Sequence, residues 1–139
     1  MNPTRARVAH DCSAGSIAGT MTFPQVVQRL VEIDAESYHA DLHRREKTYY
    51  FPDGDSVVEP EVALRPDEFG ADRIAADFSA EAVKAALAAV QSARIDYLEF
   101  LRRIMAAGTV GYTVHIRGKR VIYVGRTGDF HIEWFPGAR

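Results

Sequence analysis

Residues 96–135 read DYLEFLRRIMAAGTVGYTVHIRGKRVIYVGRTGDFHIEWF, and this stretch contains the pattern that decides the fold. Asp96 and Glu99 form a capping box, and the apolar residues after them recur at the spacing of an amphipathic helix as far as Gly108. Beyond Gly108 the apolar residues alternate with polar ones, and the turn sequences RGKR and RTGD separate three short runs. The stretch therefore predicts one helix followed by three antiparallel strands.

The residues before this stretch predict the same order of elements. Asn2 and Pro3 are typical of a helix start, and Gly19 ends that first helix. Thr22 and Gln25 form the capping box of a second helix. Alternating residues then predict three more strands, which the turn sequences RREK and PDGD separate. A further helix is predicted from Ser79 to Arg94, directly before the helix that Asp96 begins.

These elements predict a single α+β domain, residues 1–139, in which one or more antiparallel sheets pack against four helices. The length of 139 residues and the hydrophobic content of 47% are ordinary for one globular domain. Residues 60–77 contain two prolines, a glycine and several acidic residues. We expect them to form a surface connector between the halves 1–62 and 75–139.

The two halves can be aligned without gaps at an offset of 74 residues, which predicts an internal duplication. The alignment pairs the caps of two helices, Thr22 with Asp96, and also pairs strand tyrosines and turn glycines. The alternative is that two unrelated segments share an order of elements. A duplicated chain would pack about a pseudo-twofold axis, and a functional site could then lie along that axis.

Three segments, TFPQVVQRLVEIDAESYHADL, FLRRIMAAGTVGY and VIYVGRTGDFHIEWFP, resemble the YbcV-like family of small bacterial proteins. Together they extend over nearly the whole chain. The family is a domain of unknown function that is sometimes labelled "phage envelope protein", and it offers no agreed catalytic residues. The resemblance implies a bacterial, cytoplasmic protein and leaves an association with prophages open.

Charge and cysteine content restrict the classes of partner and compartment. The formal net charge is −2, which favours neither nucleic acid nor an anionic membrane as a partner. Cys12 is the single cysteine, so no disulfide can form within the chain, and the N-terminus has no apolar signal segment. These features predict a cytoplasmic protein that does not insert into a membrane, and they make a nucleic-acid partner the less favoured hypothesis.

The histidines provide the candidate metal ligands. His39, His43, His115 and His131 are all predicted to lie on the sheet face opposite the apolar side chains. Histidine with carboxylate is the usual donor set of a zinc or iron site, so His39, His115 and His131 are candidate ligands. His39 and His43 are too far apart along one strand to share an ion. A solvated polar face, which one-sided sheets normally have, is the favoured alternative.

The same face provides the candidate catalytic residues His131, Glu133 and Asp41, and Tyr112 is a further candidate on the apolar face. His131 and Glu133 could act as a general acid and base pair, with Asp41 or Tyr112 assisting. The loop Gly125–Asp129 could bind phosphate, but it has the spacing of a hairpin turn. Cys12 is expected to be structural rather than reactive.

The favoured functional hypothesis is a non-enzymatic binding or regulatory module that uses its sheet face or the seam between the halves. The alternative is a small metal-assisted or acid and base hydrolase. The final strand exposes aromatic residues such as Phe130, which predicts a homodimer that covers them. The sequence assigns no cofactor and no particular ligand.

Overall fold

The computed structural model describes residues 2–61 and 74–138. Its helices are α1 (Pro3–Ala18), α2 (Phe23–Glu32), α4 (Ala80–Gln91) and α5 (Tyr97–Ala106). Its strands are β1 (Ser37–Asp41), β2 (Glu46–Tyr50), β3 (Ser56–Pro60), β4 (Thr109–His115), β5 (Arg120–Gly125) and β6 (Phe130–Trp134). The predicted α+β class is confirmed, and the described residues form four helices and six strands. Within these residues, no helix combines the length and the apolar character that crossing a membrane requires.

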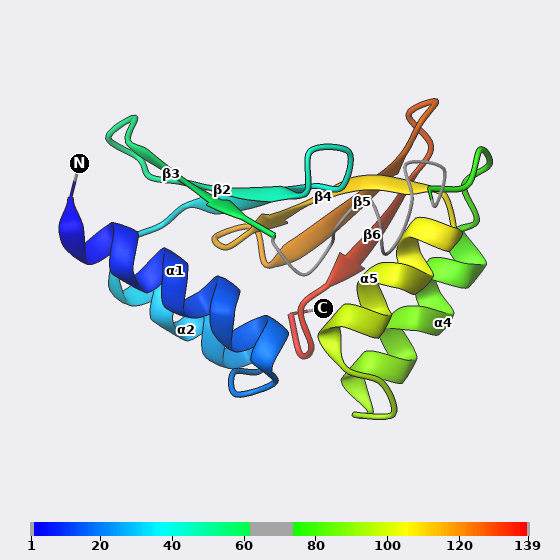
Figure 1. The fold of residues 1–139 in the computed structure, drawn as a ribbon, viewed down its shortest axis with the longest axis horizontal. Helices are drawn as coiled ribbons and strands as arrows, with labels where there is room; N and C mark the ends of the chain where they lie inside the picture. Colours follow the sequence, from blue (N-terminus) through cyan, green and yellow to red (C-terminus); the bar gives the residue numbers. More distant parts are fainter. Residues whose placement is uncertain (1, 62–73, 139) are drawn as a thin grey trace.

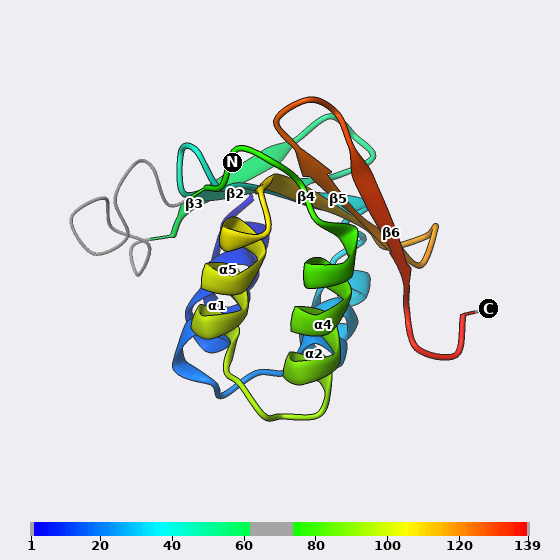
Figure 2. The ribbon, with the colours of Figure 1, turned by 90° about the vertical axis from the view of Figure 1, so that its right-hand side faces the viewer.

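One antiparallel sheet contains all six strands, in the order β3-β2-β1-β4-β5-β6. Each half contributes a three-stranded meander, and β1 joins β4 at the centre. Figure 1 shows the sheet across the top, with α1 and α2 beneath one end and α4 and α5 beneath the other. Figure 2, seen from the side, shows that the four helices lie on the same face of the sheet. The other face has no helix on it among the described residues.

Side-chain caps begin the helices where the sequence predicts. The Asn2 side chain accepts hydrogen bonds from the backbone of Thr4 and Arg5 at the start of α1. Thr22 and Gln25 form the complete capping box of α2. The caps of α4 and α5 accept the same kind of bond from the third residue of each helix. Because these bonds satisfy backbone donors that have no partner within the helix, they fix the start of each helix locally.

The predicted alternation of faces is confirmed for the central strands. Tyr38, Ala40 and Val114 face the helices and are at most 4% exposed. His39 and His115 lie on the opposite face, which we call the outer face, and are half-buried. The core therefore fills the space between the sheet and the helices.

The prediction of faces is wrong for β6. His131 pairs with Tyr123 and Glu133 pairs with Val121, and both partners are core residues on the helix side. Because directly opposed residues of an antiparallel pair share a face, His131 and Glu133 also point to the helix side. The apolar residues of β6 are on the outer face instead, and Phe130 is 61% exposed.

The two halves have identical strand registers at the predicted offset. In the first half Tyr49 pairs with Val57, and in the second half Tyr123 pairs with His131, each 74 residues further on. His39 of β1 pairs with Thr113 of β4, its own equivalent (113 − 39 = 74), so an axis relating the halves would pass between them. Residues with positive φ also match in pairs: Gly19 and Ala93, Asp34 and Gly108, Arg45 and Lys119, Gly54 and Gly128. These matches support the duplication, which remains a prediction.

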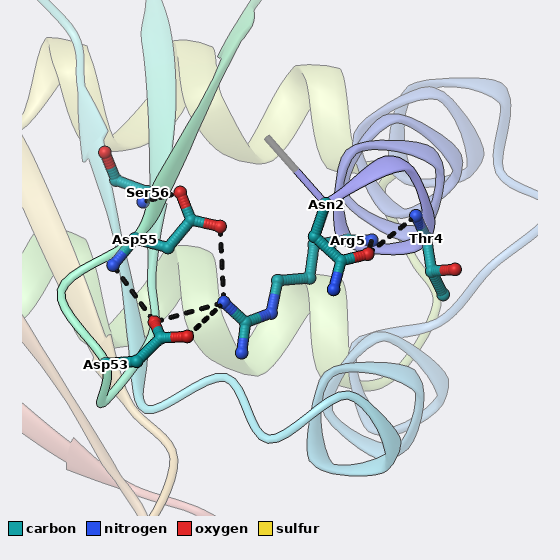
Figure 3. A network of polar contacts seen from close by, with 6 residues as sticks. All are labelled: Asn2, Thr4, Arg5, Asp53, Asp55 and Ser56. Atoms are coloured by element: carbon teal, nitrogen blue, oxygen red, sulfur yellow. Dashed lines mark hydrogen bonds and ion pairs between the residues drawn. The ribbon is translucent and has the colours of Figure 1, made fainter.

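The first half has a polar clamp that the second half lacks (Figure 3). The Arg5 guanidinium of α1 binds both carboxylate oxygens of Asp53, at 3.1 and 2.9 Å, and Asp55 at 3.2 Å. This ties the start of α1 to the turn between β2 and β3. The positions equivalent to Arg5 and Asp53 are Ser79 and Thr127, which cannot form such an ion pair.

The turn between β5 and β6 makes a different contact. Arg126 donates hydrogen bonds to the carbonyls of Ile74 and Ala75, at 2.8 and 3.3 Å. Gly125–Asp129 is a hairpin turn, as predicted, because the Gly125 amide donates to the Asp129 carbonyl. The predicted connector, residues 60–77, lies largely outside the described residues, and at its borders Glu61 and Ile74 are buried.

Candidate functional site

A cleft of about 720 Å³ lies on the helix side of the sheet, between the two helix pairs. Strands β1, β2, β4 and β5 form its roof. Its walls come from the N-terminal part of α2 on one side and from the C-terminal part of α4 with the start of α5 on the other. Ligand-binding sites of proteins have volumes of this order. The cleft lies at the seam between the halves, where a site on the axis was predicted.

Four tyrosines and Phe100 give the cleft an aromatic lining. They are Tyr38, Tyr97, Tyr112 and Tyr123. The hydroxyls of Tyr97 and Tyr112 are hydrogen-bonded at 2.6 Å, and the rings of Tyr112 and Tyr123 are 5.3 Å apart. Phe100 packs edge-on against Tyr123, with ring centroids 6.2 Å apart. Since the rings also pack on one another, the aromatic surface is held in one arrangement.

The tyrosine hydroxyls are neutral hydrogen-bonding groups. Burial raises the pKa of all four phenols above the ordinary value, so they stay protonated at neutral pH. Within the described part of the chain, the hydroxyls of Tyr38 and Tyr123 make no hydrogen bond, and both residues line the cleft. Both hydroxyls can therefore bind a polar group of a ligand in the cleft.

A buried ion pair lies beside the tyrosines. Lys47 of β2 faces the helices and is 3% exposed, and its ammonium is 3.5 Å from the carboxylate of Glu61, which is also buried. The ammonium also lies over the Tyr97 ring, 4.5 Å from the centroid, and 5.8 Å from that of Tyr38. Burial lowers the pKa of Lys47, although the Glu61 carboxylate opposes the shift. This end of the cleft thus contains its own cation, held by a carboxylate and two rings.

A histidine and carboxylate pair lies toward the β6 end of the cleft. His131 Nε2 and Glu133 Oε1 are 3.2 Å apart, and the His131 ring stacks on that of Tyr123 at 6.4 Å. Glu133 lines the cleft, and 31% of its side chain is exposed. The predicted pair is therefore formed, but on the inner face and not on the outer face.

The chain after β6 forms one border of the cleft. Phe135 packs edge-on against Phe23 at the start of α2, with ring centroids 5.3 Å apart, and Pro136 follows it along the cleft wall. Figure 1 shows this C-terminal segment descending from the sheet toward the gap between the helix pairs. The β6 end of the cleft is therefore bordered by residues from both halves.

The other predicted site residues lie away from the cleft. On the outer face, His39 Nδ1 is 2.8 Å from the Thr113 hydroxyl, and His115 borders an open depression of about 490 Å³. Asp41 accepts hydrogen bonds from the backbone of His43 and Arg44 and so stabilises its own turn. Asp41 is consequently not placed to assist His131.

The three candidate metal ligands do not converge. His39 and His115 are on the outer face and His131 is on the inner face, with the sheet between them. Within residues 2–61 and 74–138, no three histidine, cysteine or acidic side chains are grouped closely enough to hold an ion. The metal site predicted from His39, His115 and His131 is therefore corrected. The prediction assumed that the three histidines share one face of the sheet, and this assumption is wrong for His131 of β6.

Sequence reasoning missed Lys47, Glu61 and the cleft-facing role of Glu133. A signal for Lys47 was present, because Tyr49 of the same strand is inward-facing and a residue two positions earlier shares its face. A signal for Glu133 was also present. The 74-residue offset aligns His131, two residues before Glu133, with Val57, an apolar inward position.

The fold and the cleft together define a class: an α+β protein with one six-stranded antiparallel sheet, two helix pairs on the same face, and an aromatic cleft between the pairs. A family model described as "Protein of unknown function (DUF1398)" matches residues 17–133, and the chain belongs to this family. The match includes both meanders except Trp134, the last residue of β6, and three of the four described helices in full. No curated protein matches the chain.

Proposed function

We propose that the protein is a non-enzymatic binding module that holds a small hydrophobic molecule in the cleft between its helix pairs. The observation that supports it is the cleft of about 720 Å³, lined mainly by aromatic and aliphatic side chains with a few polar groups. Such a lining provides apolar contact area, while scattered hydroxyl and charged groups orient a ligand. The role requires no catalytic group.

A neutral fluorescent probe tests this proposal. N-phenyl-1-naphthylamine emits strongly only when it leaves water, so saturable emission at one probe per chain is expected. Val90 lines the cleft from α4, and Val90→Trp should fill part of the cleft and weaken binding about tenfold or more. Val31→Trp is the matched control, because Val31 of α2 is 51% exposed and lies away from the cleft.

Circular dichroism would show that both variants are folded. Absence of saturable emission with the wild-type protein would contradict the proposal. An equal loss of affinity in both variants would place the probe elsewhere and would contradict it as well.

An acid and base hydrolase is the second candidate, and one observation favours it. His131 and Glu133 form a close pair that borders the cleft, with the Tyr112 hydroxyl on the same face. Neutral His131 could accept a proton from water, with Glu133 orienting the imidazole. Hydrolysis of naphthyl esters that is lost in His131→Gln would favour this candidate over a simple binding module.

We further propose that the protein is a cytoplasmic homodimer and that its halves arose by duplication. Phe130 is 61% exposed on the edge strand β6, and Val58 is 53% exposed on the other edge strand, β3. Pairing of edges would cover such side chains. Sedimentation should give twice the chain mass for the wild-type protein and the chain mass for Phe130→Ser; a wild-type monomer would contradict the dimer.

The bacterial and prophage associations remain proposals from the family resemblance.

A further inference from the structure

The 74-residue correspondence exposes a difference in charge between the two halves. In the first half Lys47 lies opposite Glu59 on the inner face of the sheet. In the second half the equivalent pair is Val121 opposite Glu133. The carboxylate is therefore kept, while the ammonium that faces it in the first half is replaced by an aliphatic side chain.

In the first half this group contains two pairs of side chains. Lys47 pairs with Glu61, and Glu59 Oε1 is 3.0 Å from His10 Nδ1 of α1. The position equivalent to Glu61 is Phe135, so the second half lacks both members of the buried ion pair. Glu133 has His131 as its partner, as Glu59 has His10. The β6 end of the cleft thus has a partly exposed carboxylate on its wall and lacks the lysine that lies opposite the equivalent carboxylate in the first half.

The aromatic lining favours the same sign of charge. Ring faces carry negative electrostatic potential and attract cations, as the position of the Lys47 ammonium over the Tyr97 ring illustrates. Tyr123 lies beside Val121 and Glu133 in the sheet, and the Tyr112 ring packs against it at a tilt of 37°. A cation at this end would have ring faces and a carboxylate around it, as Lys47 has at the other end.

An anionic ligand would find no such place beneath the sheet, because Arg94, the other cation that lines the cleft, follows α4 and is exposed. Lys47 is 3% exposed and already has Glu61, so an anion could reach the ammonium only by displacing a buried carboxylate. That carboxylate would then be left without a partner in a buried position. At the β6 end an anion would face Glu133 and the negative ring faces.

We propose that the ligand of the cleft is a hydrophobic organic cation whose ammonium group pairs with Glu133 beside Val121 and Tyr123, in the place that Lys47 has in the first half. This inference rests on the proposed function. The apolar part of the cation would lie against Tyr112, Phe100 and the apolar cleft walls, and the Tyr123 hydroxyl would accept a hydrogen bond from the ammonium.

Three probes with one ring system separate charge from shape. They are 1-naphthylmethylammonium, neutral 1-naphthylmethanol and anionic 1-naphthylacetate, and isothermal titration calorimetry gives the affinity of each. We expect the cation to bind about tenfold or more tightly than the alcohol, and the anion to bind more weakly than the alcohol.

Variants test the named contact. Glu133→Gln should reduce the affinity for the cation about tenfold and leave that for the alcohol nearly unchanged. Glu59→Gln is the matched control, because Glu59 is the equivalent residue and does not line the cleft. Val121→Lys introduces the residue that the first half has at the equivalent position, Lys47. This variant should also bind the cation more weakly, because the new ammonium would occupy the site beside Glu133.

Each outcome decides between the two proposals. Equal or tighter binding of the anion, or unchanged affinity for the cation in Glu133→Gln, would overturn the inference and leave the binding module intact. Failure of all three probes and of the neutral fluorescent probe would overturn the proposed function itself. Binding of the alcohol without preference for the cation would overturn the inference alone.

Discussion

The halves 2–61 and 74–138 have the same strand registers but differ in what they place beneath the sheet. The first half buries the ion pair of Lys47 and Glu61. It also ties the start of α1 to the turn between β2 and β3 through the ion pair of Arg5 and Asp53. The second half has Val121 and Phe135 at the equivalent positions of the ion pair. The comparison teaches that one scaffold can bury an ion pair beneath the sheet at one end and place a partly exposed carboxylate on the cleft wall at the other.

The difference is visible in burial as well as in charge. Val57 is buried, whereas its equivalent His131 is half-buried. The side chain of Glu59 is 17% exposed, against 31% for Glu133. The inner face of β6 is therefore less covered than that of β3, and this opens the cleft toward β6.

High pH should produce the largest effect and should unfold both halves together. Burial raises the pKa of Tyr38 and Tyr49 in the first half and of Tyr97, Tyr112 and Tyr123 in the second. Above pH 10 the unfolded chain loses phenolic protons that the folded chain keeps, so stability falls by about 1.4 kcal/mol per tyrosine and pH unit. The lowered pKa of Lys47 makes stability rise with pH in the range below the ordinary lysine value of 10.5. This contribution comes from one group, against five tyrosines that act the other way.

Absorbance at 295 nm and circular dichroism, recorded together, measure this effect. Ionisation of the five buried tyrosines should coincide with one loss of secondary structure. Two separate transitions would show that the halves unfold independently and would contradict a shared core.

The next effect concerns the ion pair that distinguishes the halves. Glu61→Gln should lower the free energy of unfolding by about 3–5 kcal/mol, because it leaves the Lys47 ammonium buried without a carboxylate. The double variant Lys47→Val with Glu61→Phe has the residues of the second half at these two positions. Its free energy of unfolding should fall much less than that of Glu61→Gln. Urea unfolding measures both; a loss in Glu61→Gln below about 1 kcal/mol would mean that the pair is effectively solvated.

The smallest expected effect concerns two helix caps, a feature in which the halves are alike. Thr22 and Asp96 cap α2 and α5 at equivalent positions, and Thr22→Ala and Asp96→Ala should each cost about 1 kcal/mol of unfolding free energy. The loss should be somewhat larger for Asp96, because its carboxylate also interacts with the helix dipole. Gln28→Ala on the exposed face of α2 is the control and should cost little. A negligible loss in either cap variant would contradict the equivalence.

Most of the fold could be predicted from local signals. Caps such as Thr22 with Gln25, and turns such as Gly125–Asp129, act over a few residues and are visible in the sequence. The strand order was not visible, because the β1 to β4 pairing joins residues about 74 positions apart, such as His39 and Thr113. Local patterns do not encode which strands meet at the centre of a sheet.

The candidate site was predicted less completely. The rule that apolar residues face the core placed Phe130 inward, but the register set by the β5 to β6 turn brings His131 opposite Tyr123. The rule fails there because β6 is an edge strand and its inner face is incompletely covered by the helices. Burial of apolar side chains therefore does not decide which residues of β6 face inward. Lys47 was missed for a related reason: a charged residue in a strand is usually exposed, unless a distant carboxylate such as Glu61 is brought beside it.

The most direct test of the central claim is the location of a bound molecule. The ring signals of all tyrosines can be followed by NMR with ¹³C-labelled tyrosine while 1-naphthylmethanol is added. We predict saturable shifts for Tyr38, Tyr97, Tyr112 and Tyr123, which line the cleft, and none for Tyr50, which is 40% exposed outside it. Shifts of Tyr50 with the four cleft tyrosines unchanged would contradict the assignment of the cleft as the binding site.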